Sequence, residues 1–576
     1  MKINTQRLSS PYFLPAAAAL ISFVLYSSSL RNGFVYDDYL VLVDNPWVLT
    51  KSYLGSLFSQ KYFFLTGEAS YRPLVSLCYY VFTRVFGIQS FGFHFLSLLF
   101  HSLVTFQVTR FAQKLGLGRS ALWVGTAFGL HPLLSEAVCG ISFLEDPLCA
   151  FFIMTGVLLL PWRSEATDTN KTKSAIWRGL GLGGCLMLSC LAKESGLFLL
   201  LFIIFLVFAG SLWGMEKKII RSFLLISLPA GILYGYLRFL LFPGPRFQIS
   251  YLGGSPGAAI INTLPIFSSY LARLIYPLTL SVDRHRELIF HPWNIRFLGS
   301  LFVHGVLAIS AILCFRRSPV FSLGVAWFYL ALVPVANIVP LFHPEADRYT
   351  YLASVGFFLC MGTLLETFRK RNISRIMIFL WAALVLLWGT RTLIRVQDWE
   401  NNTRLWQHEY ILNPQNDKAI TELAVQANAS RDYPRAEVLA RKSLALNPEY
   451  GLAQLQLAKS LFMQDKDQEA LVLYLKAIHS GGLHFHHLSD AWFDVGYIFD
   501  EKRHSPEKAK AAYHQALRAN PASLSAANNL GTLLAEEGDL SGALEVWKKA
   551  LALHPDDKEL QHNIEYASRA LGKKPK

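Results

Sequence analysis

The sequence predicts an all-α protein in two parts: a polytopic membrane domain over 1–396 and a tetratricopeptide-repeat α-solenoid over 397–576. The chain is 53% hydrophobic and 16% charged, whereas charged residues make up about 25% of an ordinary soluble domain. Up to residue 396, apolar runs of roughly 20 residues, long enough to cross a bilayer, follow one another. After them, prolines recur at a spacing of 34 residues, which is the period of a helix-turn-helix repeat.

The apolar runs predict eleven membrane-spanning helices. The first run also fits a signal peptide, but no small-x-small cleavage site follows it, so we expect a retained span. A further run, 258–280, is expected to be re-entrant or interfacial, because the basic loops alternate correctly only if it does not cross. The expected spans are 11–30, 91–110, 121–139, 143–161, 177–191, 196–213, 219–242, 297–315, 319–341, 349–368 and 375–396.

Basic clusters between the runs set the expected orientation. Lys and Arg favour the cytoplasmic side, which places the Asp37–Asp38 pair, the short polar loops and the C-terminal domain on the outer side. The net charge of +14 is therefore interpreted as a topology signal, and we expect no nucleic-acid partner. The cysteines lie in or beside apolar segments without metal spacing, which argues against a disulfide framework. The clusters lie at 110–119, 163–178, 217–221, 316–317 and 369–375.

The C-terminal part predicts about four repeats and a capping helix. Prolines at 414 and 448 are 34 residues apart, as are those at 521 and 555, and the gap of 73 between 448 and 521 is two periods plus five. We expect the extra five residues in the insert "GGLHFHH" (481–487). Small residues such as Gly531 and Ala543 allow close helix contact, and residues 556–571 are expected to cap the stack.

The sharpest candidate site is the adjacent acid pair Asp37 and Asp38, in "FVYDDYLVLVDNP" (34–46). One carboxylate could take a proton from an acceptor hydroxyl, while the other holds it in place or helps to bind a divalent cation. The alternative is an acidic turn at the membrane interface with no chemical role.

Further polar residues are expected on the same outer face. Ionisable residues at membrane depth are costly, so each is a candidate for function. Arg72 suits phosphate oxygens through its forked guanidinium, whereas Lys193 beside Glu194 also fits a salt-bridged interface pair. A carboxylate acting as a base, scattered cations and a site in the membrane are together suited to the displacement of a lipid phosphate from a sugar. The candidates are Arg72, His131, Glu136, Lys193, Glu194 and Arg348.

An ordered series of motifs resembles one known family. The motifs are "NGFVYDDYLVLVDNP", "SYRPL", "HPLLSEAV", "AKESG", "DRYTYLASVGF" and "DWENNTRLWQHEYILNPQN", followed by the repeats. They resemble the transmembrane and tetratricopeptide-repeat glycosyltransferases, relatives of the protein O-mannosyltransferases with the GT-C fold. The resemblance covers nearly the whole chain. It implies inverting transfer of a sugar, mannose in the eukaryotic members, from a polyprenyl- or dolichyl-phosphate donor to Ser or Thr hydroxyls of a protein, or to a glycan.

The resemblance also implies residue roles. It places the base at Asp37, its partner or a metal ligand at Asp38, and the lipid-phosphate site at Arg72, Lys193 and Arg348. This chain has "DRY" where the family has "ERY". It also has Glu145 and Asp146 where the family usually carries an arginine followed by an aspartate, which leaves donor specificity open.

The repeats would recruit the acceptor protein close to the membrane site. Four repeats are fewer than many family members carry, which favours a bacterial inner membrane with the sites and repeats facing the periplasm. The endoplasmic reticulum membrane, with the sites in the lumen, is the alternative.

Two other classes of function stay open at this point. A non-enzymatic scaffold would use its repeats to recruit partners to an assembly or secretion complex, although eleven spans are many for an anchor. A transporter or flippase for lipid-linked sugars would explain charges in the membrane, but not an acid pair in an outer loop. Either class should tolerate Asp37→Asn, whereas a transferase should not.

Overall fold

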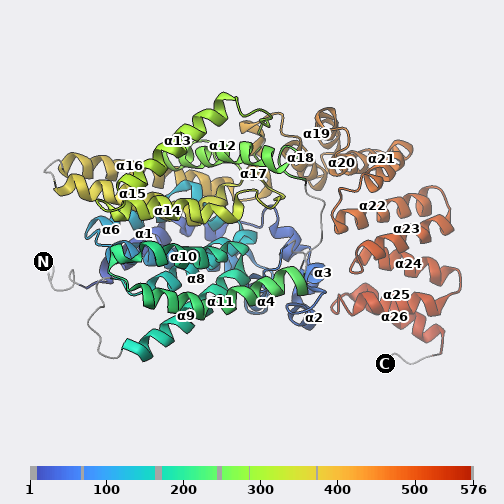
Figure 1. Cartoon of the computed structure of the whole chain (residues 1–576). Helices are drawn as coiled ribbons and strands as arrows, with labels where there is room; N and C mark the ends of the chain where they lie inside the picture. The colour runs from blue at the N-terminus through green and yellow to red at the C-terminus, as the bar shows by residue number, and fades with distance from the viewer. Residues whose placement is uncertain are drawn as a thin grey trace, which may run out of the picture. The chain divides into compact units, whose positions relative to one another are not determined.

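The computed structural model describes residues 10–66, 70–162, 171–242, 250–284, 286–370 and 374–572, and every regular element among them is a helix. The chain divides into two compact units, Met1–Asn401 and Asn402–Lys576 (Figure 1). A helical membrane domain followed by a repeat solenoid is the predicted fold class, which is confirmed.

The first unit contains, within its described ranges, nine helical stretches long and apolar enough to cross a membrane. Four shorter apolar helices accompany them, and the protein is therefore a multi-pass membrane protein. The helices labelled in the figures are α1 (Phe13–Tyr26), α2 (Lys51–Ser56), α3 (Tyr62–Thr66), α4 (Pro73–Phe86), α5 (Ser90–Lys114), α6 (Ser120–Leu130), α7 (Ser135–Cys139), α8 (Glu145–Leu159), α9 (Lys171–Ala192), α10 (Phe198–Ala209), α11 (Lys217–Tyr236), α12 (Pro256–Ile275), α13 (Ile295–Leu313), α14 (Pro319–Leu332), α15 (Thr350–Lys370) and α16 (Ser374–Asp398).

Small residues let the helices of this unit approach closely. α5 packs against α1, α6 and α8, and α14 lies beside α15. A Cβ atom on Gly324 of α14 would lie only 2.6 Å from the carbonyl oxygen of Gly356 on α15. Such glycine contacts replace the hydrophobic driving force that lipid removes between membrane helices.

The run predicted as one span at 121–139 is instead two helices. α6 ends at Leu130, and a short 3₁₀ turn beginning at Pro132 leads to α7. The residue before a proline avoids the helical conformation, and His131 is extended, with φ −77° and ψ 126°. The break matters because it directs α7 and its side chains toward the site. Two members of the basic clusters, Arg163 and Arg371, lie outside the described residues.

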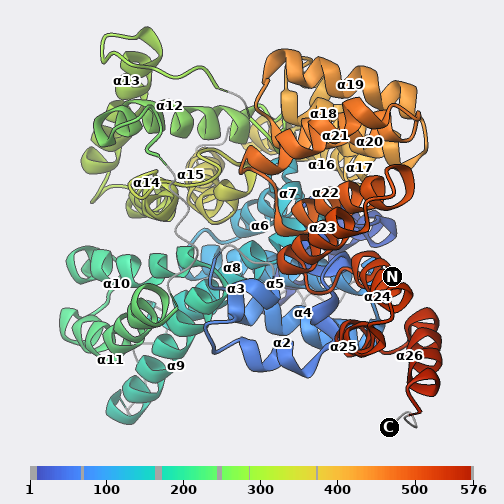
Figure 2. The same cartoon turned by 90° about the vertical axis from the view of Figure 1, so that its right-hand side faces the viewer.

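The segment predicted to be re-entrant or interfacial forms α12. This helix is long and apolar enough to cross a membrane. In Figure 2, however, it runs across the view, whereas α14 and α15 are seen close to their axes. Its extensive packing is against α13. The non-crossing assignment of 258–280 stays a prediction.

The second unit is a row of antiparallel helix pairs. After α17 (Asn402–Leu412), four pairs and a final helix follow, with small residues such as Ala436, Ala470 and Ala543 buried between them. The pairs are α18–α19 (Asp417–Ala429, Tyr433–Leu446), α20–α21 (Gly451–Phe462, Asp467–His479), α22–α23 (Phe485–Tyr497, Pro506–Ala519) and α24–α25 (Leu524–Glu536, Leu540–Leu551), before α26 (Lys558–Ala570).

The extra five residues of the repeat are not where the sequence placed them. The first helices of successive repeats begin at residues 417, 451, 485 and 524, so the irregular spacing lies after 485 rather than in "GGLHFHH". A five-residue π-helical turn, Ile498–Lys502, extends α22 before α23 begins. The expected position was wrong because the proline spacing fixes the total length of the insert and not its place.

Candidate active site

The acid pair lies in a loop that one of its own carboxylates holds in place. Asp38 is fully buried, and its Oδ2 accepts the backbone N–H of Val35 at 3.0 Å, while its Oδ1 accepts that of Ser142 at 2.7 Å. It thereby fastens the loop after α1 to the turn before α8. Burial raises the pKa of Asp38 from 3.8 to about 7. Asp37 is half-buried, so it is the more open member of the pair.

Arg72 and Lys193 meet in one charged cluster, and each comes from a break between helices. Arg72 is the residue before α4, and Lys193 is extended, with φ −161°, between α9 and the next 3₁₀ turn. Arg72 Nη1 donates to Glu145 Oε1 at 3.0 Å, and Lys193 Nζ donates to Asp146 Oδ1 at 2.6 Å. Glu145, which stands where the family usually carries an arginine, is therefore the partner of Arg72, and Asp146 is the partner of Lys193.

Glu194 adds a third carboxylate to this cluster and links Arg72 to a further cation, Arg238. Its carboxylate lies 3.7 Å from Arg72 Nε and 3.4 Å from Arg238 Nε. Among these contacts three cations face three carboxylates, so the charges are close to balanced. Glu145 Oε2 and Asp146 Oδ2 are buried in the described structure without a hydrogen-bond partner. Because an unpaired buried carboxylate oxygen is costly, these two atoms are suited to accept a hydroxyl or a water.

Glu136 and Arg348 form a second, buried ion pair. Arg348 Nη1 lies 2.5 Å from Glu136 Oε1, and the backbone N–H of Arg348 donates to Glu136 Oε2 at 2.8 Å. Glu136 comes from α7, beyond the helix break, and Arg348 from the 3₁₀ turn Asp347–Tyr349 that precedes α15. Two interruptions of the helical structure thus bring together residues 212 positions apart.

Aromatic rings join the ion pairs and the acid loop into one region. The Arg348 guanidinium lies 4.2 Å from the centre of the Phe143 ring, and Phe143 follows Ser142, which anchors Asp38. Lys193 Nζ lies 5.6 Å from the centre of the Tyr349 ring. A small pocket lies here, and its polar lining comes from Asp146, Lys193, Ser195 and Tyr349.

His131 does not join this region. Its Nε2 lies 3.1 Å from the carbonyl oxygen of Leu274, and its Nδ1 accepts the N–H of Leu133 at 3.3 Å. The ring also packs edge-on against Trp388, with centroids 4.6 Å apart. With both ring nitrogens bonded to backbone, His131 holds the helix break together and does not contact the pocket.

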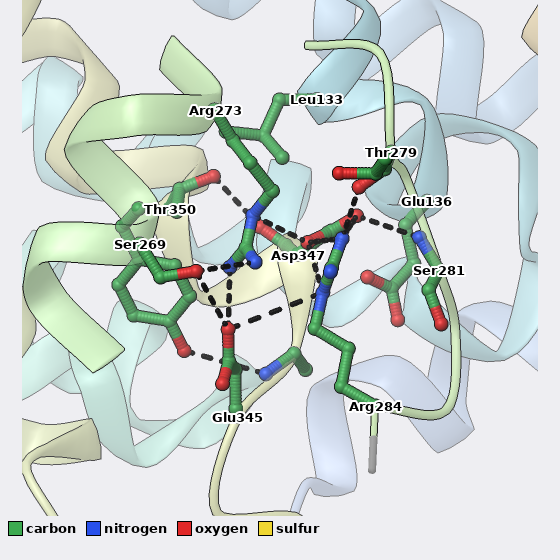
Figure 3. A network of polar contacts seen from close by, with 12 residues as sticks. Leu133, Glu136, Ser269, Arg273, Thr279, Ser281, Arg284, Glu345, Asp347 and Thr350 are labelled. Carbon is green, nitrogen blue, oxygen red and sulfur yellow. Dashed lines mark hydrogen bonds and ion pairs between the residues drawn. The ribbon is translucent and has the colours of Figure 1, made fainter. Parts of the chain in front are cut away.

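A second polar network contains residues that the sequence did not point to. Arg273 of α12 and Arg284 both bind Asp347, with nitrogen–oxygen distances of 3.2 Å. Arg273 and Arg286 both bind Glu345, at 2.8 and 2.9 Å. Figure 3 shows Arg273 and Arg284 pointing at these carboxylates from different elements. Because Asp347 precedes Arg348, this network adjoins the Glu136–Arg348 pair.

Four arginines of these networks were not predicted from the sequence, and only two of them could have been. Arg273 and Arg238 lie within apolar runs, so the rule that charges at membrane depth are costly would have found both. Arg284 and Arg286 lie in an irregular segment without periodicity, and their partners are about 60 positions away. Nothing local in the sequence predicts that pairing.

The described residues contain no group of three or more His, Cys, Asp or Glu side chains arranged to hold a metal ion. Asp38, the expected ligand, uses both of its oxygens to accept backbone N–H groups. These residues therefore do not fit a metal site, and the role of a divalent cation stays a prediction without a ligand set here.

The fold and site define the class as a multi-pass helical membrane protein with buried ion pairs at its helix breaks and a repeat solenoid. Residues 501–558 match the family model described as tetratricopeptide repeat. One solved structure, a tetratricopeptide-repeat protein described as "YrrB: a TPR protein with an unusual peptide-binding site", is 18% identical and covers 29% of this chain and 84% of its own, with a TM-score of 0.25.

Over most of its length the chain is TMTC-like. It is 20% identical to the human protein O-mannosyl-transferase TMTC3 across 94% of the chain and 64% of that relative. It is 29% identical to the Drosophila melanogaster protein O-mannosyl-transferase Tmtc2 across 46% of the chain and 29% of that relative. The chain spans just under two thirds of the length of the TMTC3 relatives it matches.

Proposed function

We propose that the protein is a membrane glycosyltransferase. It moves a mannose-like sugar from a polyprenyl- or dolichyl-phosphate donor to a protein Ser or Thr hydroxyl, or to a glycan, on the outer face. The observation that supports this most is that Arg72, Glu136, Lys193 and Arg348 come from separate segments and form buried ion pairs near a small pocket that Lys193 lines. Asp37 is the neighbour of Asp38, which is bonded to the turn before α8 in the same region. The TMTC relatives, named as protein O-mannosyl-transferases, support the same class.

In the proposed reaction Asp37 takes the proton of the acceptor hydroxyl. The hydroxyl oxygen bonds to the anomeric carbon from the face opposite the phosphate, the bond between that carbon and the phosphate oxygen breaks, and the lipid phosphate leaves with the electron pair. The sugar is therefore transferred with inversion. Asp38 keeps the loop in place through Val35 and Ser142, so it is a positioning residue.

Arg72, Lys193 and Arg348 are the cations proposed to face the departing phosphate. Each of them already contacts a carboxylate, so the region offers little net positive charge. That balance suits a phosphodiester with one negative charge better than a more highly charged pyrophosphate carrier. The unpartnered oxygens of Glu145 and Asp146 are suited to accept sugar hydroxyls.

The repeats are proposed to bind the acceptor protein and keep it near the membrane. We further propose a bacterial inner membrane with the site and the repeats facing the periplasm, the endoplasmic reticulum lumen being the alternative. The orientation is inferred from the basic loops of the sequence, and the bacterial membrane from the number of repeats.

The experiment is transfer of radiolabelled sugar from a panel of polyprenyl- and dolichyl-phosphate donors, in membranes with and without the protein. Label in protein or glycan that depends on the protein, with mannose among the best donors, is the expected result. If no donor in the panel gives such label, the scaffold function takes precedence, and co-purification of partners through the repeats becomes the next test.

A further inference from the structure

The arginine network around Asp347 and Glu345 has an open side. The side chain of Arg273 is 5% exposed, whereas those of Arg284 and Arg286 are 16% and 29% exposed. The recorded ion pairs of this network join three guanidiniums to two carboxylates. Glu287, the next acid along the chain, instead pairs with Arg296 at 3.1 Å. Asp283, directly before Arg284 in the chain, adds a third acid to this part of the surface. What distinguishes the network from the cluster around Lys193 is therefore the partial exposure of Arg284 and Arg286 beside apolar side chains.

Two irregular segments lie on one turn of α12 beside these arginines. The side chain of Asn262 bonds both backbone groups of Ile289, each at 2.8 Å. The hydroxyl of the next residue, Thr263, donates to the carbonyl of Ala336 at 3.2 Å and accepts from Asn337. The segments before and after these contacts are therefore neighbours on the protein surface.

Both segments expose apolar side chains next to their anchors. Ile289 is buried, yet its neighbours Leu288 and Phe290 are exposed. After the buried Asn337, the side chains of Ile338, Val339 and Phe342 are exposed in the same way. We call these five exposed residues the apolar rim. Large apolar side chains in irregular backbone are unfavourable in water, but they are suited to the boundary of a membrane, where lipid covers them.

We propose that Arg284 and Arg286, with the apolar rim beside them, form a docking site for the lipid-linked phosphate of the donor as it arrives from the outer leaflet. The guanidiniums bind the phosphate oxygens, and the apolar rim contacts the first isoprene units. A phosphodiester on a hydrocarbon chain matches two partly exposed guanidiniums next to an apolar surface. The identification of the ligand as the lipid-linked donor rests on the proposed function.

The position of the site explains how it serves the reaction. Asp347, the partner of Arg284, is the residue before Arg348 in the 3₁₀ turn. A donor held at the rim therefore needs to move only a short way to bring its sugar to the pocket. We expect Arg284 and Arg286 to affect donor capture, and so KM, more than kcat.

The test is binding of radiolabelled polyprenyl phosphate, without sugar, to the purified full-length protein in nanodiscs of zwitterionic lipid. Arg286→Gln is expected to weaken binding roughly tenfold, as loss of one charge-assisted contact would. Arg296→Gln, an exposed arginine outside the network, is the matched control and should bind as the wild type does. Glu345 keeps Arg273 in the Arg286→Gln variant, and the melting temperature of each variant checks that it is folded.

Further variants separate charge from hydrocarbon. Arg286→Lys keeps the charge and should retain most of the binding, whereas Phe290→Gln should weaken it. Unchanged binding in a folded Arg286→Gln protein would overturn the proposal, as would equal displacement by inorganic phosphate or by phosphatidylglycerol. If binding depends on Arg286 and the wild type transfers no sugar, the docking site stands and the proposed transferase function fails.

Discussion

The Glu136–Arg348 pair gives the sharpest prediction about stability. The two side chains are 3% and 9% exposed, and they are joined by an ion pair at 2.5 Å and by a backbone hydrogen bond at 2.8 Å. Removing one member of such a pair leaves a buried charge uncompensated, which typically costs about 3–5 kcal/mol. Replacing both members by uncharged side chains of similar size removes that penalty. We therefore expect Glu136→Gln and Arg348→Met each to destabilise strongly, and the double variant to lose much less than the sum.

The assay is thermal unfolding of the four proteins in the same detergent, followed by tryptophan fluorescence. The expected order is wild type, then the double variant, then the two single variants, with a coupling of about 2 kcal/mol or more. Additive losses would show that Glu136 and Arg348 do not compensate each other. Single variants as stable as the wild type would refute the buried pair itself.

Three further predictions concern single sites. Asp38→Ala leaves the buried N–H groups of Val35 and Ser142 without their acceptor, so we expect it to destabilise the protein by about 2–4 kcal/mol in the same unfolding assay. A loss under about 1 kcal/mol would contradict the role of Asp38 as the loop anchor. Gly531→Ala would push a Cβ atom against Trp547 Nε1 and should destabilise the last repeat by about 1–3 kcal/mol. Limited proteolysis should then cut that repeat faster than in the wild type. Gly482→Ala, with open space around it, is the control and should leave the rate of cleavage unchanged. Burial lowers the pKa of His486 and His487 to about 3 and 4; their neutral form thus favours the folded state above their unfolded pKa near 6.5, and this contribution is lost as pH falls toward the folded values. We expect the repeats to be less stable at pH 5.5 than at pH 7.5 by about 1 kcal/mol for each histidine, or roughly 2–3 kcal/mol for the two together. The double His486→Gln, His487→Gln variant should lose this dependence, and an unchanged dependence would place its origin elsewhere.

The repeat unit could be predicted from sequence almost helix by helix. A period of 34 residues fixes where each first helix begins, and the small residues at the contacts, such as Ala436, Ala470 and Ala543, are buried as expected. The exception is the extra turn Ile498–Lys502. Proline spacing measures the length between two repeats, and no residue in that interval marks where the insertion is absorbed.

The sequence predicts most helices of the membrane unit, but it predicts less well the positions at which these helices are interrupted. Hydropathy averages over roughly 20 residues, so it joined α6 and α7 into one span although Pro132 marks the interruption. The breaks are what position Glu136 and Lys193. The pairing of Arg284 with Asp347 depends on how distant segments fold onto α12, which no local pattern in one sequence contains.

The charge balance around Lys193 shows the same limit. The sequence indicates the cations as single residues, and Glu145 as a departure from a family pattern. Only the geometry shows that Arg72 and Lys193 face Glu145 and Asp146 at 3.0 and 2.6 Å. The docking site is proposed at Arg284 and Arg286 because these guanidiniums are partly exposed beside apolar side chains.

The most direct test of the central claim is sugar transfer by Asp37→Asn at matched abundance, beside Asp44→Asn as control. Asp44 is an exposed acid in the same stretch and lies outside the site. We predict that the wild type and Asp44→Asn transfer label from a polyprenyl- or dolichyl-phosphate sugar, and that Asp37→Asn loses at least about 100-fold in kcat with its fold intact, as removal of a general base would cause. Transfer by Asp37→Asn at the wild-type rate would contradict the account.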